Sequence, residues 1–116
     1  NTVQETIDFM EKVDMPNFRL LLDTFHMNIE EPSIYDSLHA AAGKFSYLHT
    51  VDSNRWAPGF GHLDFDQIAK ILHEIGYDGT LSAEALPLPD PNSAARQALQ
   101  VYKRMNAIIH TGVIPE

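Results

Sequence analysis

Three residues that could bind a metal ion, Asp23, His49 and Glu84, each lie at or near the carboxyl end of a short apolar segment. Two carboxylates and one imidazole are a ligand set that suits Mn²⁺, Mg²⁺, Co²⁺ or Zn²⁺. Each residue alone has an ordinary explanation: Asp23 as a cap of the following turn, His49 as a core histidine, Glu84 as an acidic loop residue. Their repetition at the same place in three successive segments favours a shared site.

The elements that must position these residues alternate between strand and helix. We expect strands at 18–23, 45–51 and 80–84, and helices at 2–13, 31–43, 64–76 and 90–110. Apolar residues recur at helical spacing in the longer segments, whereas the strand segments are short and almost continuously apolar. Strands that are joined through helices form a parallel sheet by right-handed crossovers. The sequence therefore predicts an α/β fold with three parallel strands and four helices.

The polar residues at the strand ends indicate which α/β fold this is. In a (β/α)8 barrel the active site lies at the carboxyl ends of the strands, which is where Asp23, His49 and Glu84 fall. Such a barrel needs eight strands and about 250 residues. We therefore expect residues 1–116 to form the C-terminal part of a TIM barrel, opening on a helix whose preceding strand is absent.

Composition excludes several other classes of protein. The 8 Lys and Arg against 16 Asp and Glu give a net charge of −8, which opposes binding to nucleic acid or to an anionic membrane. There is no Cys, so disulfides, thiolate metal sites and Cys nucleophiles are excluded. No apolar run approaches the roughly 20 residues that span a bilayer. We expect a soluble, cytoplasmic protein.

Two further residues have the chemistry to contact a substrate. His26 follows Asp23 by three residues, so its imidazole should project over the strand end and could bond a hydroxyl group. Arg55 lies in the long loop after the second strand, where a guanidinium could hold a hydroxyl or an anionic oxygen. Either residue could also be an ordinary loop or surface residue.

Nearly the whole chain resembles the C-terminal part of the xylose-isomerase-like TIM-barrel superfamily of sugar phosphate isomerases and epimerases. Within it, the sequence is most similar to the ketose 3-epimerases that act on D-tagatose and D-psicose. The matching segments are Leu-Asp-Thr-Phe-His-Met-Asn-Ile-Glu-Glu at 22–31, Leu-His-Thr at 48–50, Asp-Ser-Asn-Arg at 52–55, Pro-Gly-Phe-Gly-His at 58–62 and Ile-Gly-Tyr-Asp-Gly at 75–79. The strand that bears Glu84 follows the last of them.

The resemblance implies a specific chemistry for these residues. One divalent cation, most often Mn²⁺ or Co²⁺, is held in that family by Glu, Asp, His and Glu from four consecutive strands, and the last three match Asp23, His49 and Glu84. His26 and Arg55 match positions that contact the sugar. The two metal-bound glutamates exchange a proton with opposite faces of the sugar through a cis-enediolate, so Glu84 would be one acid–base residue and the other would precede Asn1.

We therefore expect the parent protein to be a metal-dependent sugar or sugar phosphate isomerase or epimerase, and we expect it to act on a ketose at C3. The 116-residue chain should be inactive alone, and a homo-oligomer or the rest of the barrel should cover its exposed inner face. Where the nearest members have Pro-Phe after the glutamate, this chain has Ala85-Leu86, which leaves the substrate open.

Three alternatives remain. The first is an enzyme similar to hydroxypyruvate isomerase or inosose dehydratase, which would share the metal ligands. The second is a barrel fragment without catalysis. The third is an enzyme similar to endonuclease IV, which shares the Asp-Thr-x-His strand end but needs an Asp-x-His pair; here His62 and Asp64 stand in the reverse order.

Overall fold

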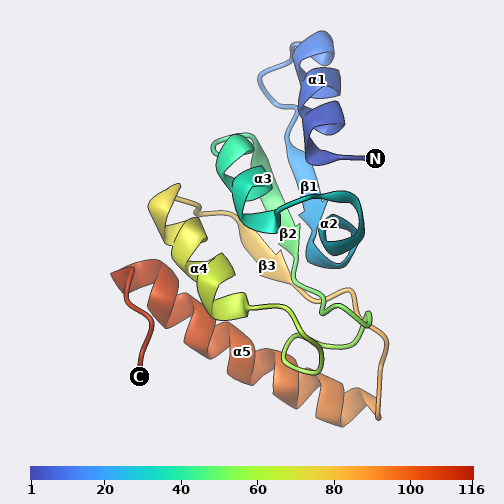
Figure 1. The fold of residues 1–116 in the computed structure, drawn as a ribbon, viewed down its shortest axis with the longest axis vertical. Helices are drawn as coiled ribbons and strands as arrows, with labels where there is room; N and C mark the ends of the chain where they lie inside the picture. The colour runs from blue at the N-terminus through green and yellow to red at the C-terminus, as the bar shows by residue number, and fades with distance from the viewer.

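A computed structural model describes residues 1–116 (Figure 1). The sheet at its centre has three parallel strands, as expected, and they lie side by side in the order in which they follow one another along the chain. Five helices accompany it. The elements in chain order are α1 (Val3–Val13), β1 (Leu20–Asp23), α2 (Thr24–Glu30), α3 (Ile34–Ala40), β2 (Phe45–His49), α4 (Phe65–Glu74), β3 (Thr80–Ser82) and α5 (Pro91–Thr111). The α/β class and the partial barrel are confirmed, and the number of helices is corrected from four to five.

The additional helix arises because the segment after β1 forms two helices where one was expected at 31–43. The Asp23 side chain accepts hydrogen bonds from the backbone N–H groups of Phe25 and His26, so α2 begins directly after the strand. Glu31 is extended, with φ −101° and ψ 137°, because the proline that follows it disfavours the helical conformation. Ser33 then caps α3, so Pro32 separates two helices instead of starting one.

The strands are shorter than expected, which moves one candidate residue out of the sheet. β2 ends at His49 because the Thr24 hydroxyl, 2.8 Å from the Val51 nitrogen, takes the Val51 N–H that a longer strand would offer to its neighbour. β3 ends at Ser82, so Glu84 lies in the following loop and not in a strand at 80–84. β1 likewise begins at Leu20 and not at residue 18.

The caps expected at the starts of α1, α4 and α5 are present in the structure. Thr2 and Glu5 form a capping box at the start of α1, and Asp64 and Asp90 cap α4 and α5. Gly112 ends α5 in the left-handed conformation, with φ 72°. None of the helices combines the length and apolarity needed to cross a membrane.

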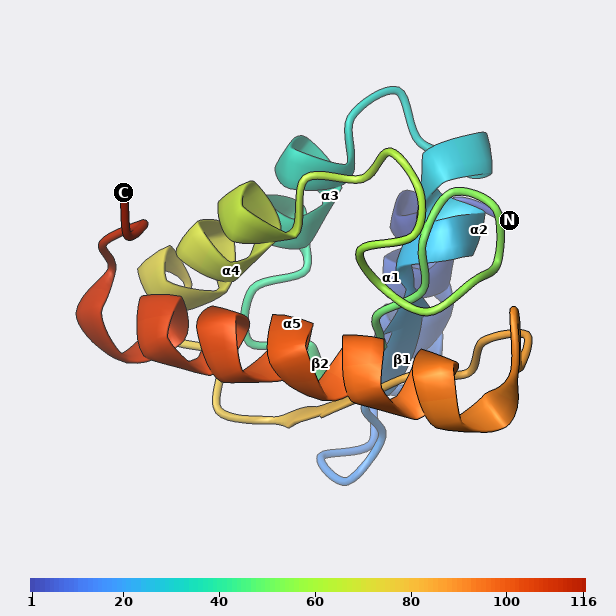
Figure 2. The ribbon, with the colours of Figure 1, turned by 90° about the horizontal axis from the view of Figure 1, so that it is seen from below.

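One face of the sheet is covered by helices and the other is open. In Figure 2, α3 and α4 lie on one side of the strands, and α5 packs alongside α4. Leu20, Leu22 and Leu48 point into this core and are at most 5% exposed. The alternate residues Leu21 and Tyr47 point to the other face, where they are 52% and 40% exposed. Parallel sheets are normally covered on both faces, so this apolar face is the one that a complete barrel would enclose.

Candidate functional site

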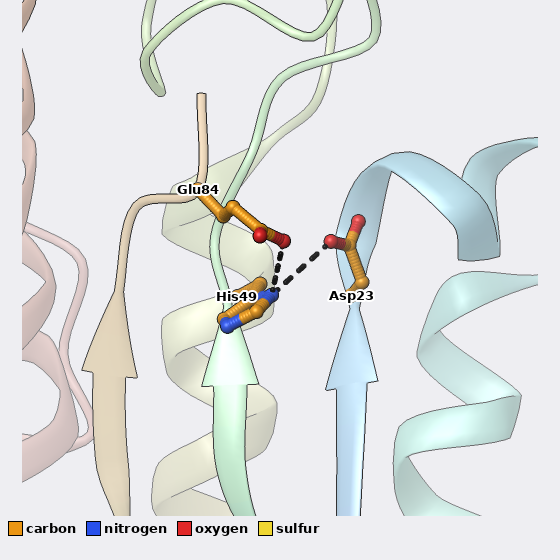
Figure 3. A group of neighbouring side chains, drawn as sticks. All are labelled: Asp23, His49 and Glu84. Carbon is orange, nitrogen blue, oxygen red and sulfur yellow. Dashed lines mark ion pairs between the residues drawn. The ribbon is translucent and has the colours of Figure 1, made fainter. Parts of the chain in front are cut away.

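Asp23, His49 and Glu84 meet at the carboxyl edge of the sheet, as the sequence predicted (Figure 3). Asp23 and His49 are the last residues of β1 and β2 and are paired in the parallel register. His49 Nδ1 lies 3.4 Å from Asp23 Oδ2 and 3.1 Å from Glu84 Oε2. One candidate ligand atom from each residue lies within 4.8 Å of the others.

The three side chains differ in how firmly the fold holds them. Asp23 is nearly buried, and its Oδ1 accepts N–H groups of α2 from Phe25 at 3.0 Å and His26 at 3.2 Å. The cap role considered for Asp23 is therefore real, and it leaves Oδ2 directed toward His49. The His49 side chain is 17% exposed at the end of the central strand. The Glu84 side chain is 66% exposed, and only its contacts with neighbouring side chains at the site hold it there.

Arg55 reaches the same group from the loop after β2. Its Nη1 lies 3.1 Å and 3.0 Å from the two carboxylate oxygens of Asp23, and its Nη2 lies 3.1 Å from Glu84 Oε2. The guanidinium also lies over the ring of Phe25, 5.1 Å from the ring centre. The sequence predicted that Arg55 could hold an anionic oxygen; in this structure those oxygens belong to the protein's own carboxylates.

A buried carboxylate that sequence reasoning did not single out organises the Arg55 loop. Asp52 is fully buried and accepts backbone N–H groups from Ser53 at 2.8 Å, Gly59 at 2.8 Å and Leu63 at 3.1 Å. The Arg55 N–H in turn donates to the Asp52 carbonyl at 3.0 Å, and Arg55 has a φ of 66°. The available signal was an acid at the start of a loop rich in glycine, where backbone can approach a side chain closely.

His26 lies on the first turn of α2 and lines a cavity of about 310 Å³ that Asp23, His49 and Glu84 also line. The structure thus places His26 beside the group, bonded to Asp23 through its backbone N–H, whereas its imidazole makes no hydrogen bond to the group. A larger cavity of about 770 Å³ lies between α4, α5 and the start of β3 and includes His73 and Tyr102. This cavity shares no residue with the acidic group and lies away from the carboxyl ends of the strands, where the active site of a barrel is found.

His62 and Asp64, the residues that an enzyme similar to endonuclease IV would use, do not belong to the site. Asp64 caps α4 by accepting the N–H of Gln67 at 3.1 Å. The His62 N–H donates to the Ser53 hydroxyl at 2.9 Å, within the loop. Neither side chain belongs to the Asp23, His49 and Glu84 group, so the three-metal arrangement of endonuclease IV gains no support here.

The donor atoms fit a divalent cation. Two carboxylate oxygens and an imidazole nitrogen gathered at one point match the ligands of Mn²⁺, Co²⁺ and Zn²⁺. They match Mg²⁺ less well, because that ion prefers ligands that are all oxygen atoms. The fold and this group together define part of an α/β barrel with a possible metal-binding site at the carboxyl edge of its sheet.

The chain belongs to the xylose isomerase-like TIM barrel family, whose model matches residues 1–105. It is 44% identical over 84 residues to the D-psicose 3-epimerase of Ruminiclostridium cellulolyticum, a match covering 72% of this chain and 29% of that protein. It is 38% identical over 101 residues to the L-ribulose 3-epimerase of Mesorhizobium japonicum, covering 85% of this chain and 34% of that protein. The chain therefore spans about a third of the length of these relatives.

Solved structures agree with this assignment. The D-psicose 3-epimerase from Clostridium cellulolyticum H10, determined with D-tagatose, superposes with a TM-score of 0.83 at 31% identity. The match covers 94% of this chain and 44% of that one. The expected family resemblance and the expected partial barrel are both confirmed.

Proposed function

We propose that these 116 residues form the C-terminal part of the barrel of a metal-dependent sugar epimerase that acts on a ketose at C3. The observation that carries the proposal is the convergence of Asp23 and His49, at the ends of β1 and β2, with Glu84 in the loop after β3, their ligand atoms lying within 4.8 Å of one another. The support from similarity is that the relatives are named ketose, D-psicose and L-ribulose 3-epimerases.

In this proposal Asp23, His49 and Glu84 are ligands of one divalent cation, with Mn²⁺ as the preferred ion. The chemistry that such an ion supplies is stabilisation of negative charge on the sugar oxygens during proton transfer. The firm hydrogen bonding of Asp23 Oδ1 keeps Oδ2 directed into the site. His49, at the end of the central strand, lies between the two carboxylates.

The catalytic residue in this chain is Glu84, whose carboxylate removes or returns the proton on the carbon beside the sugar carbonyl. Its exposed side chain is the one that an incoming substrate can reach most easily. His26, on the wall of the same cavity, is positioned to bond a sugar hydroxyl. Arg55 supplies a guanidinium for a sugar oxygen.

Inversion at one carbon needs a second acid–base group on the opposite face of the sugar, and Glu84 is the one exposed carboxylate that this chain brings to the site. We propose that the second one, a further metal ligand, comes from outside residues 1–116, and that these residues alone do not turn over a ketose. The exposed Leu21 and Tyr47 lie on the face that the remaining barrel strands, or a second copy of the chain, would cover. The native mass of the chain, measured alone and together with the remaining barrel, tests whether this face is covered by another chain.

Metal binding is the first test, because it needs no turnover. We expect Mn²⁺ titrated calorimetrically into the chain to bind at one site, and His49→Ala to weaken binding at least about tenfold. His110→Ala is the matched control, because His110 lies near the end of α5, where its ring hydrogen-bonds the Asn106 carbonyl, and it is not part of the acidic group. Equal Mn²⁺ affinity in wild type and His49→Ala would contradict the proposal.

Proton exchange tests the chemistry. When the full barrel is incubated with Mn²⁺ and D-psicose in D₂O, deuterium should enter at C3 and the C3 epimer should accumulate. Glu84→Gln removes the proton acceptor while keeping the side-chain size, so exchange should fall at least about a hundredfold. Deuterium entry at C1 instead would indicate aldose–ketose isomerisation, as in the alternative similar to hydroxypyruvate isomerase, while loss of water would indicate the dehydratase alternative.

A further inference from the structure

Arg55 occupies the part of the site that a bound cation would need. Its guanidinium contacts both oxygens of Asp23 and one oxygen of Glu84 at 3.0 to 3.1 Å. The same Asp23 Oδ2 and Glu84 Oε2 are the oxygens nearest His49 Nδ1. The positive charge of the arginine and that of a divalent ion would therefore bind the same two oxygen atoms.

Asp23 does not depend on Arg55 for its orientation. Its Oδ1 is fixed by N–H groups at the start of α2, so the side chain would stay in place without the guanidinium. The contact that Arg55 adds to Oδ2 is a charge-assisted bond to the atom left free for a ligand. The charge of Arg55 at this position therefore opposes the binding of a metal cation.

The backbone around Arg55 is held independently of the guanidinium. The ring of Phe25 lies beneath it at 5.1 Å, and the loop that carries Arg55 is held by Asp52 whatever the side chain does. The Arg55 side chain is 22% exposed, so it has a path toward the open side of the site. Its backbone can stay fixed while the side chain moves.

We propose that Arg55 is the internal counter-cation of this site: it neutralises Asp23 and Glu84 when no metal is bound, and it competes with the divalent ion for their oxygens. This inference rests on the metal site of the proposed function. Binding of the ion displaces the guanidinium from Asp23 Oδ2 and Glu84 Oε2. Arg55 then becomes available to a sugar oxygen only when the metal is in place, which couples substrate binding to metal occupancy.

Mn²⁺ affinity tests the competition directly. The intensity of the free Mn²⁺ electron paramagnetic resonance signal gives the dissociation constant for each variant. Arg55→Gln removes the charge, and we expect about tenfold tighter Mn²⁺ binding; Arg55→Lys keeps the charge but loses the two-pronged contact, so it should lie between. Arg104→Gln, which removes an arginine paired with Asp66 away from the site, should bind Mn²⁺ as wild type does.

A second measurement uses the unaltered chain, in case Arg55→Gln folds poorly. The Arg55 Nε–Hε signal in ¹⁵N–¹H spectra should move toward the position of solvent-exposed arginines as Zn²⁺, a diamagnetic ion, is added. The midpoint of this change should equal that of the calorimetric Zn²⁺ titration. An Arg55 signal that stays in place at saturating Zn²⁺ would overturn the inference.

The outcomes separate this inference from the proposed function. Mn²⁺ binding that is unchanged or weaker in Arg55→Gln, with the wild-type site still dependent on His49, would refute competition and leave the metal site intact. Absence of Mn²⁺ binding in both wild type and Arg55→Gln would remove the metal site and the inference with it. Binding in Arg55→Gln alone would support both.

Discussion

Replacing Asp52 by alanine tests the reasoning that one buried carboxylate holds the loop that carries Arg55. The fully buried side chain accepts three backbone N–H groups, from Ser53, Gly59 and Leu63. Each donor left without an acceptor in a buried position costs about 1–3 kcal/mol. Water that enters the vacated space recovers part of this, so we expect Asp52→Ala to lower the free energy of unfolding by about 3 kcal/mol, a large share of the 5–15 kcal/mol typical of a domain.

Two further variants calibrate that number. Asp52→Asn keeps the volume and one acceptor oxygen, but its amide group would face a backbone N–H, so we expect a loss of about 1–3 kcal/mol, smaller than that of alanine. Asp8→Ala truncates an exposed carboxylate on α1 that contacts only the Gln4 amide, and its effect should stay within about 0.5 kcal/mol.

Urea unfolding can be followed at two places. Trp56 is the single tryptophan and lies in the same loop, so its fluorescence reports the loop, whereas far-ultraviolet circular dichroism reports the five helices. In Asp52→Ala the fluorescence transition should move to lower urea than the circular dichroism transition. A loss below about 1 kcal/mol, or native Trp56 emission identical to wild type, would refute the assigned role of Asp52.

Three more predictions concern Gly61, Asp66 and Tyr77. A Cβ on Gly61 would clash with Asp52 Oδ1, so we expect Gly61→Ala to lower the free energy of unfolding, measured in urea, by about 1–3 kcal/mol. The hydrogen bond from Arg104 lowers the pKa of Asp66 in the folded protein. The stability that this pair contributes is present above about pH 4 and is lost as the pH falls through the lowered pKa. We therefore expect Tm to fall more steeply below about pH 4 in wild type than in Arg104→Gln. Burial raises the pKa of Tyr77 to about 12, so the free energy of unfolding should decline between about pH 10 and 12. When the tyrosinate absorbance of Tyr77→Phe is subtracted from that of wild type, the remaining titration should have its midpoint near pH 12.

Local signals in the sequence were enough to predict the topology. Short apolar segments separated by amphipathic helices predicted three parallel strands. The starts of three helices were predictable because each cap, at Thr2–Glu5, Asp64 and Asp90, depends only on residues close to it in the sequence. The segment after β1 was predicted wrongly because Pro32 can either begin a helix or end one. Glu31 and Ser33 decide this in the structure, by an extended backbone before the proline and a cap after it.

The convergence of Asp23, His49 and Glu84 was predictable for a different reason. Parallel strands place their carboxyl ends on one edge, so the position of a residue along each strand is enough to bring the three side chains together. Glu84 was nevertheless placed in a strand that ends two residues earlier, and the sheet hydrogen bonds do not hold it. The Leu86 N–H, which donates to the Arg55 carbonyl at 2.8 Å, ties its loop to the site instead.

The charge balance of the site could not be predicted, because it depends on a loop that folds around its own buried acid. Asp52 sets the path of this loop, the path sets where Arg55 begins, and Arg55 then contacts Asp23 and Glu84. No periodic pattern in the sequence indicates these contacts. Two of the three candidate ligands are therefore already paired with a cation of the protein itself, so the number of acidic residues alone would overstate how strongly this edge attracts a divalent ion.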